Sequence, residues 1–119
     1  MKATIPIILF IIFGHVVGFS QQTINKSEYI RKGGHPELEY GGIVYYHDSL
    51  FTGTAIERIS NGQIICEEHY EKGKPHGLWK HWYKTGEKKF EGRWNHGEPE
   101  GPWIIWKKDG TITNIEPRE

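Results

Sequence analysis

The chain has very little cysteine, no net charge and only one long apolar run. Cys66 is the single cysteine among 119 residues, so an internal disulfide is excluded and packing and strand pairing must hold the fold together. Fifteen basic and fifteen acidic side chains give a formal net charge of zero. Nucleic acid is therefore an unsuitable partner, because its phosphates require an excess of lysine and arginine. The same balance gives only weak support to docking on a lipid surface.

The one long apolar run lies at the N-terminus, at residues 5–13 after the basic start Met1-Lys2. It is shorter than the roughly 20 apolar residues that span a membrane. Small residues near Ser20 suit a signal peptidase. We predict a signal peptide at residues 1–20 and an exported protein, whether periplasmic, in the outer envelope or secreted. An uncleaved N-terminal membrane anchor is the alternative.

Helical apolar spacing is also missing after residue 20, whereas glycine and aromatic residues are abundant, with 15 Gly, 5 Trp and 6 Tyr. These residues recur every 24 positions: Trp82 aligns with Trp106, and Trp79 with Trp103. A fixed period in this range indicates stacked structural repeats. Eight glycines recur at this spacing or flank the loops between the expected hairpins. We predict that they are structural turn residues: Gly53, Gly62, Gly73, Gly77, Gly86, Gly97, Gly101 and Gly110.

Short hairpin turns set the expected fold. Asn61-Gly62 lies between two β-forming runs and favours a type I′ turn, in which both central residues have positive φ. Gly41-Gly42 predicts a further hairpin between residues 38–40 and 43–46. We predict an all-β fold, an antiparallel meander of 24-residue hairpin repeats in a single-layer, elongated sheet. The expected segments are a polar leader (21–37), a repeat domain (38–116) with a partial first unit (38–52) and units at 53–76, 77–100 and 101–115, and a tail (117–119).

Candidate catalytic and metal-binding groups do not converge in this alignment. No column holds two histidines, since His76 aligns with Glu100 and His96 with Lys72. Glu67 and Glu91 share a column beside basic residues, which indicates cross-strand ion pairs. Cys66 aligns with Phe90, as expected of a small apolar core residue. We therefore predict no enzyme activity, no catalytic residues, no metal ligands and no cofactor.

Aromatic residues are the candidate partner-binding groups. Alternation along a strand places Trp82 and Trp106 on the face opposite Trp79 and Trp103. Rings in one column can stack along the array, and rings on an uncovered face can contact a protein. The predicted partner-binding residues are Trp82, Trp106, Tyr83, Trp79 and Trp103.

The repeat resembles a known family in its residues Gly77-Leu78-Trp79, Trp82-Tyr83, Thr85-Gly86, Phe90-Glu91-Gly92, Trp94 and Gly97 to Gly101. It is similar to the MORN repeat, and more closely to the bacterial variant in YwqK-type proteins labelled as antitoxins of toxin–antitoxin systems. The similarity covers residues 38–115. It implies rows of β-hairpins that act as scaffolds, protein-binding surfaces or lipid-binding modules.

Our leading hypothesis from the sequence is a non-enzymatic, exported scaffold or protein-binding module that uses its aromatic strip. An immunity-like antitoxin, implied by the resemblance, is the first alternative, and a peripheral lipid-binding module is the second. The last strand, residues 111–115, has no successor, so its edge offers a further hypothesis of self-association.

Overall fold

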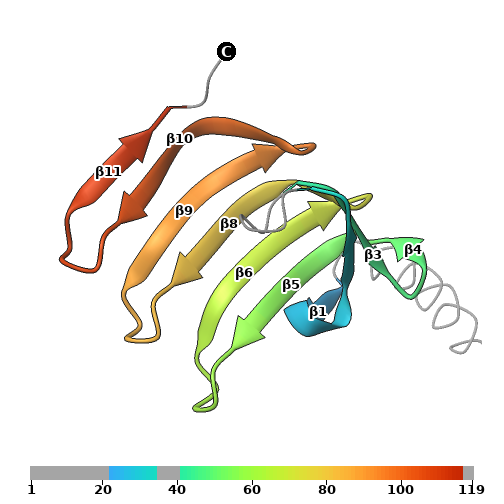
Figure 1. Cartoon of the computed structure of the whole chain (residues 1–119), viewed down its shortest axis with the longest axis horizontal. Coiled ribbons are helices and arrows are strands. Elements are labelled where there is room, and N and C mark those ends of the chain that lie inside the picture. Colours follow the sequence, from blue (N-terminus) through green and yellow to red (C-terminus); the bar gives the residue numbers. More distant parts are fainter. Residues whose placement is uncertain (1–21, 35–40, 117–119) are drawn as a thin grey trace, which may run out of the picture.

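A computed structural model describes residues 22–34 and 41–116, and these residues are mostly β-strand and turn (Figure 1). The prediction of a β-rich fold is confirmed. The strands are β1 (Thr23–Asn25), β2 (Ile30–Lys32), β3 (Ile43–Tyr46), β4 (Ser49–Leu50), β5 (Gly53–Arg58), β6 (Ile64–Glu71), β7 (Lys74–Pro75), β8 (Gly77–Trp82), β9 (Lys88–Asn95), β10 (Glu98–Trp106) and β11 (Ile112–Ile115). Within these ranges the one helical element is a short 3-10 turn, η1 (Lys26–Glu28). The predicted signal peptide and tail lie outside the described residues.

The large sheet has the order β1-β5-β6-β8-β9-β10-β11, and the short strand β7 pairs with β6. Neighbours from β5 to β11 are antiparallel, but β1 runs parallel to β5, with Thr23 opposite Thr54. The prediction of a purely antiparallel meander is therefore wrong at this edge. Parallel pairing needs a long crossover connection, and the chain between β1 and β5 supplies one. Gly53 permits the approach, because a Cβ at this position would collide with the carbonyl oxygen of Gln22.

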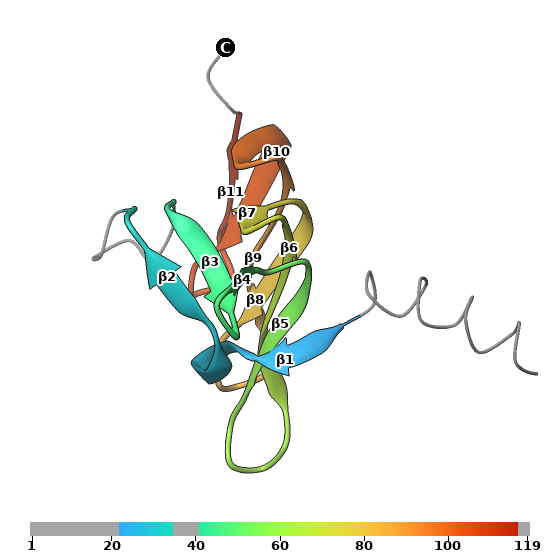
Figure 2. The same ribbon diagram turned by 90° about the vertical axis from the view of Figure 1, so that its right-hand side faces the viewer.

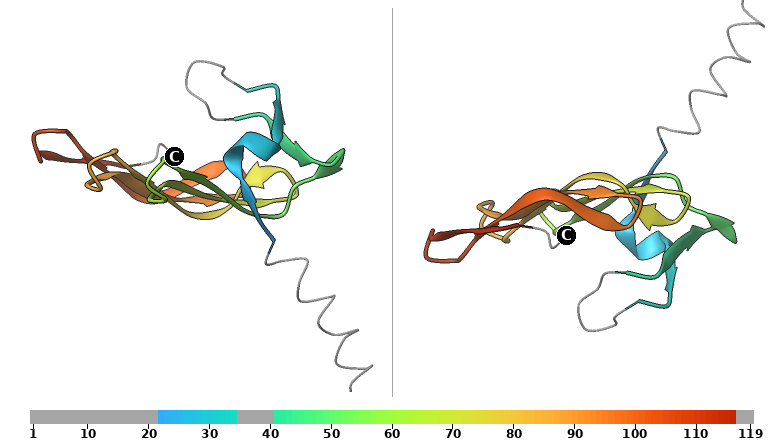
Figure 3. Two further views of the ribbon diagram at one scale, coloured as in Figure 1. Left: turned by 90° about the horizontal axis from the view of Figure 1, so that it is seen from below. Right: turned by 90° about the horizontal axis from the view of Figure 1, so that it is seen from above.

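A second sheet covers part of the first. Strands β2, β3 and β4 form it, and Figures 2 and 3 show it standing against one face of the large sheet, beside β1 and β5. The prediction of a single layer is therefore wrong, because β2 of the leader and β3 and β4 of the predicted partial first unit form a second layer. Ile24 of the leader is buried in the core, which gives this segment an apolar contact despite its polar composition.

Strand β3 does not pair as predicted from the hairpin around Gly41-Gly42. Ile30 lies opposite Tyr45, and Tyr45 lies opposite Leu50, so β3 is between β2 and β4. Residues 38–40 lie outside the described residues.

Backbone hydrogen bonds recur at the 24-residue spacing. The N–H of Ile59 donates to the carbonyl of Gln63 at 3.0 Å, and the equivalent bonds, from Tyr83 to Glu87 and from Lys107 to Thr111, are both 2.8 Å long. Three successive hairpins are therefore built alike. All eight predicted turn glycines have positive φ, from +70° at Gly101 to +149° at Gly53.

An aromatic row runs across the large sheet on the face that carries the second layer. Ring centroids are 5.3 Å apart for Tyr70 and Trp79, 5.5 Å for Trp79 and Trp94, and 5.0 Å for Trp94 and Trp103. The core residues around this row are Ile24, Val44, Phe51, Ala55, Tyr70, Trp79 and Trp94. Trp103, farther along the sheet, is half-buried. The row therefore passes from a covered to an uncovered part of the same face.

The tryptophan contacts repeat as well. The indole Nε1 of Trp79 donates to the carbonyl of His69 at 2.8 Å, and that of Trp103 donates to the carbonyl of Arg93 at 3.1 Å. The Trp103 ring lies directly against Gly92, where a Cβ would collide with the indole. The residue 24 positions before Gly92 is Glu68. The strand position beside the repeated tryptophan is thus a glycine in one repeat and a glutamate in the other.

Candidate functional site

The predicted partner-binding aromatics are divided between the two faces of the large sheet. Trp79 is 3 % exposed and belongs to the core, so its ring is inaccessible. Trp103 packs on the same face, beside Phe90 and Trp94. By strand register and alternation, Trp82 and Trp106 lie on the opposite face, which the second sheet does not cover. Tyr83 is tied to the last of these, because its hydroxyl donates to the carbonyl of Trp106 at 2.7 Å.

Trp82 and Tyr83 line a groove of about 580 Å³, which we call the Trp82 groove. Its lining residues are Ile65, Trp82, Tyr83, Lys84, Thr85, Glu87, Lys89 and Lys108. Lys89 Nζ lies 5.8 Å and Lys108 Nζ 6.0 Å from the centroid of the Tyr83 ring. Three cationic side chains and one carboxylate around an apolar floor make the Trp82 groove locally positive, although the whole chain is neutral.

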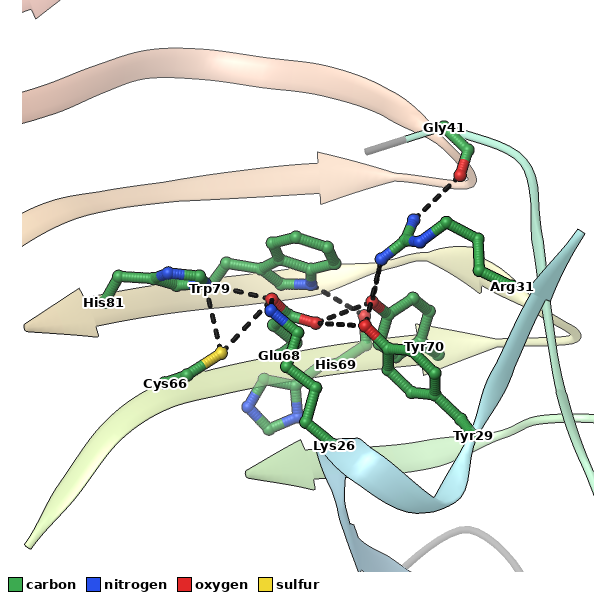
Figure 4. A network of polar contacts seen from close by, with 10 residues as sticks. All are labelled: Lys26, Tyr29, Arg31, Gly41, Cys66, Glu68, His69, Tyr70, Trp79 and His81. Atoms are coloured by element: carbon green, nitrogen blue, oxygen red, sulfur yellow. Dashed lines mark hydrogen bonds and ion pairs between the residues drawn. The ribbon is translucent and has the colours of Figure 1, made fainter. Parts of the chain in front are cut away.

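A buried carboxylate occupies the other face. Glu68 is 1 % exposed and lies beneath the second layer (Figure 4). Its Oε1 accepts hydrogen bonds from the hydroxyls of Tyr70 at 2.7 Å and Tyr29 at 3.4 Å. Its Oε2 lies 3.0 Å from His81 Nε2 and 3.2 Å from Lys26 Nζ. We call this group the Glu68 cluster.

The cluster extends from the sheet to the second layer. The Cys66 thiol donates to Glu68 Oε2 at 3.2 Å. Arg31 of β2 donates to the hydroxyls of Tyr29 at 3.0 Å and Tyr70 at 3.4 Å, and to the carbonyl of Gly41 at 2.8 Å (Figure 4). Charged hydrogen bonds of this kind are about twice as strong as neutral ones. The Glu68 cluster therefore fastens η1 and β2 to the large sheet.

Burial and charge act in opposite directions on Glu68. Burial alone raises its pKa, but the hydrogen bond from His81, the charge of Lys26 and the bond from Tyr70 lower the pKa to about 2. Burial and the nearby Glu68 charge raise the pKa of Tyr70 above its ordinary value. Glu68 is thus a stable anion and Tyr70 a stable donor at neutral pH.

Cys66, Glu68 and His81 resemble a nucleophile, acid and base by residue type, and their side-chain atoms lie close enough to hold a metal ion. The surroundings favour a structural role. Burial and the Glu68 charge raise the pKa of the Cys66 thiol, so a nucleophilic thiolate is disfavoured. The Lys26 ammonium, 3.2 Å from Glu68, already provides a cation beside the carboxylate.

A second hollow, of about 640 Å³, lies between η1, β2 and β5 and includes Lys26, Arg31 and Arg58 in its lining. Each of these cations contacts the protein itself. Lys26 pairs with Glu68, Arg31 donates to tyrosine hydroxyls, and Arg58 Nη1 donates to the carbonyl of Gly62 at 2.8 Å. These contacts make the hollow a weaker candidate for an anion than its composition suggests.

The 24-residue alignment did not reveal two groups that the structure brings together. Glu68 shares a face with Cys66 and Tyr70 by alternation, so an acid on an apolar face was the available signal. His76 and His96 occupy different columns, yet their ring centroids are 4.2 Å apart, because turns from successive repeats lie side by side. The expected cross-strand ion pair of Glu91 is present with Lys80 at 4.0 Å, and Lys88 of the same strand lies 3.4 Å away. Glu67 instead lies 3.3 Å from His69 of its own strand.

No protein-family model, curated protein or solved structure matches this chain. Within residues 22–34 and 41–116, no helix has the length and apolar character that crossing a membrane requires.

Proposed function

We propose that this protein is a non-enzymatic binding module whose Trp82 groove holds an acidic segment of a protein partner. The observation that carries the proposal is the groove itself, in which Trp82, Tyr83 and Ile65 form an apolar floor beside Lys84, Lys89 and Lys108. Tryptophan and tyrosine are the residues most enriched at binding hot spots. Lysines at the rim select an acidic partner and accelerate its association.

The arrangement suits contact better than chemistry. The Tyr83 hydroxyl is held by the carbonyl of Trp106, and the Lys89 and Lys108 ammonium groups lie near its ring. These interactions fix the ring in place before a partner arrives, which lowers the entropy lost on binding. Thr85 carries a hydroxyl that could serve as a nucleophile only with a base beside it, and the groove lining contains no histidine for that role.

The repeat family and the cellular location of the protein are also part of the proposal. We assign the chain to the MORN-variant repeat proteins, and the recurrence of the Ile59, Tyr83 and Lys107 hydrogen bonds at 24-residue spacing supports this assignment. We further propose that residues 1–20 are a signal peptide that exports the protein, so that the partner is found in the cell envelope or outside the cell. Processing at Ser20 in the producing cell, measured by mass spectrometry, tests the export step.

Capture of a partner from a cell-envelope extract tests the binding function. The bait is the otherwise wild-type chain with a photocrosslinking residue at Thr85, which lines the groove without charge, and the test variant adds Trp82→Ala and Lys108→Glu. We expect the variant to lose at least about tenfold in captured partner, because hot-spot truncation costs about 2 kcal/mol or more. Lys72→Glu is the matched control, since it makes the same charge change at an exposed turn on the other end of the sheet.

Equal capture by the wild-type and groove variants, with unchanged circular dichroism, contradicts the proposal. A parallel flotation experiment uses vesicles with and without phosphatidylserine. Flotation with anionic vesicles that the same groove variant abolishes would assign the groove to lipid and reject the protein partner. Absence of flotation together with groove-dependent capture supports the protein partner.

A further inference from the structure

Turns from two successive repeats meet at the end of the large sheet away from the Trp82 groove. Lys72-Gly73 joins β6 to β7, and His96-Gly97 joins β9 to β10 (Figures 1 and 2). The Gly97 N–H donates to the carbonyl of Pro75 at 2.8 Å. The His96 N–H donates to Nδ1 of His76 at 3.1 Å. These bonds hold the two turns side by side and bring their side chains together.

Three potential metal ligands converge at this point. Glu71 Oε2 lies 3.3 Å from His76 Nε2 and 3.2 Å from His96 Nε2, and the three ligand atoms are all within 4.8 Å of one another. A tetrahedral Zn²⁺ with bonds of about 2.1 Å separates its ligands by about 3.4 Å. The two carboxylate-to-imidazole distances therefore already match two of the ligand-to-ligand separations of such a site.

We propose that Glu71, His76 and His96 form a Zn²⁺ site with three protein ligands, its fourth position open to water. Two imidazoles and one carboxylate are a ligand set that zinc accepts. The proposal concerns the end of the sheet remote from the Trp82 groove and is independent of the proposed partner binding.

His96 is oriented for this role. Its Nδ1 lies 2.8 Å from Oδ1 of Asn95, so the amide oxygen holds the ring proton on Nδ1 and leaves the Nε2 lone pair directed at Glu71. In that tautomer Nε2 and the carboxylate oxygen are both acceptors, and a cation between them removes the repulsion. Metal-binding histidines characteristically donate their other ring N–H to an oxygen in this way.

His76 must change one contact. Its Nδ1 accepts the N–H of His96, so the neutral ring carries its proton on Nε2. Coordination through Nε2 transfers that proton to Nδ1 or solvent and replaces the hydrogen bond. The His96 side chain is 61 % exposed, so water reaches the turn and can accept the freed N–H. The aliphatic part of the Lys74 side chain lies alongside Gly97.

The Glu68 cluster provides an internal comparison, because Cys66, Glu68 and His81 are also close enough to hold a metal. That group is buried and already contains Lys26. Zinc at the Glu71 site instead contacts two turns at the surface. Bound metal would join the unit that ends at His76 to the unit that contains His96, and the folded state would gain stability by mass action.

A zinc titration of the full chain without a histidine tag tests the proposal. Affinity is measured by competition with a chromophoric zinc chelator, and stability by thermal unfolding. We expect one Zn²⁺ per chain and a higher midpoint of unfolding in its presence. His96→Ala and His76→Ala should each weaken binding by at least about tenfold, as removal of even an outer partner of a zinc ligand costs tenfold or more. Co²⁺ should show the visible absorption of tetrahedral coordination.

His47→Ala is the matched control, because His47 is exposed and belongs to neither metal-compatible group. Its affinity should equal that of the wild type. The proposal is overturned if the wild-type chain binds no zinc in competition with the chelator. It is equally overturned if His76→Ala and His96→Ala leave affinity unchanged, or if Cys66→Ser abolishes binding.

Discussion

A carboxylate buried in an aromatic core loses its hydrating water, and hydrogen bonds and charges from the protein must replace it. Glu68 has five such partners, two of them the hydroxyls of Tyr70 in β6 and of Tyr29 between η1 and β2. Lys26 of η1 faces the same carboxylate and is itself largely shielded from solvent. A buried pair of this kind gives little net stability over an apolar pair, but removal of one partner is costly. The fold of the leader therefore depends on one side chain of β6.

Glu68→Gln should destabilise the protein by about 3 to 5 kcal/mol, because it leaves the Lys26 ammonium without its buried counter-charge. Urea unfolding measures the difference in free energy of unfolding. Glu67→Gln, at the half-buried neighbouring position on the opposite face of β6, is the control and should change the free energy of unfolding by less than about 1 kcal/mol. Equal effects of the two substitutions would show that the buried pair is not coupled to folding.

Acid should weaken the wild-type protein over a defined pH window. The folded-state pKa of Glu68 is lowered from 4.5 to about 2, so its contribution is complete above pH 4.5 and is lost as the pH falls toward 2. A shift of this size corresponds to about 3 kcal/mol. Urea unfolding at a series of pH values from neutral to about 2 measures the loss. Glu68→Gln should show a flatter dependence, and parallel curves for the two proteins would contradict the assignment.

At the scale of the hairpin, the contact between Gly92 and Trp103 is the clearest constraint. Gly92 lies within β9 and is not among the glycines with positive φ, so the nearest obstacle to a side chain there is the Trp103 indole and not the backbone conformation. Gly92→Ala should therefore cost about 1 to 3 kcal/mol by overpacking. Chemical denaturation of the single and double variants forms a double-mutant cycle. In the Trp103→Ala background the alanine should cost almost nothing, whereas additive effects would exclude a direct clash.

Hairpins were the predictable elements of this fold. Asn61-Gly62, Thr85-Gly86 and Asp109-Gly110 mark turns by local chemistry, and alternation then assigns the faces of the strands around them. β1 could not be predicted, because a three-residue strand in a polar leader acquires its parallel pairing with β5 only from tertiary contacts. The same limit applies to the second layer.

The candidate sites were less predictable than the strands. Alternation separates Trp82 from Trp79, but only the lining of the Trp82 groove relates Trp82 to Lys108. Column alignment compares equivalent positions, whereas His76 and His96 meet across the boundary between repeats. The burial of Glu68 is not predictable from the sequence, because its counter-charge comes from Lys26, 42 positions earlier. Contacts between unlike positions require knowledge of how the chain folds back on itself.

At the scale of the whole molecule, the second layer divides the large sheet into a covered and an uncovered part. β6 has paired strands on both sides, and three of its side chains are buried beneath the second layer. β11 is an edge strand whose four residues are all exposed. Local stability follows burial and pairing. The sheet should consequently open first at its C-terminal edge.

Hydrogen exchange measured by mass spectrometry should show this gradient. Peptides from β6 and β8 should exchange only through opening of most of the sheet, while peptides from β11 should exchange at least about tenfold faster. The reason is the single neighbour of β11 and the exposure of Ile112 and Ile115. Uniform protection across the sheet would mean that it opens as one cooperative unit.

The two edges of the large sheet differ, and this difference determines which repeat unit can be duplicated. Duplication of residues 77–100 would add a hairpin that needs no contact with the leader, since Gly92 and Trp103 complete the face without Lys26. A copy of residues 53–76 placed at the same point would instead set a second Glu68 beside the Trp103 indole with no ammonium group to meet it. The charge-bearing unit is confined to the beginning of the array, and the tryptophan-bearing unit is the one that can be multiplied.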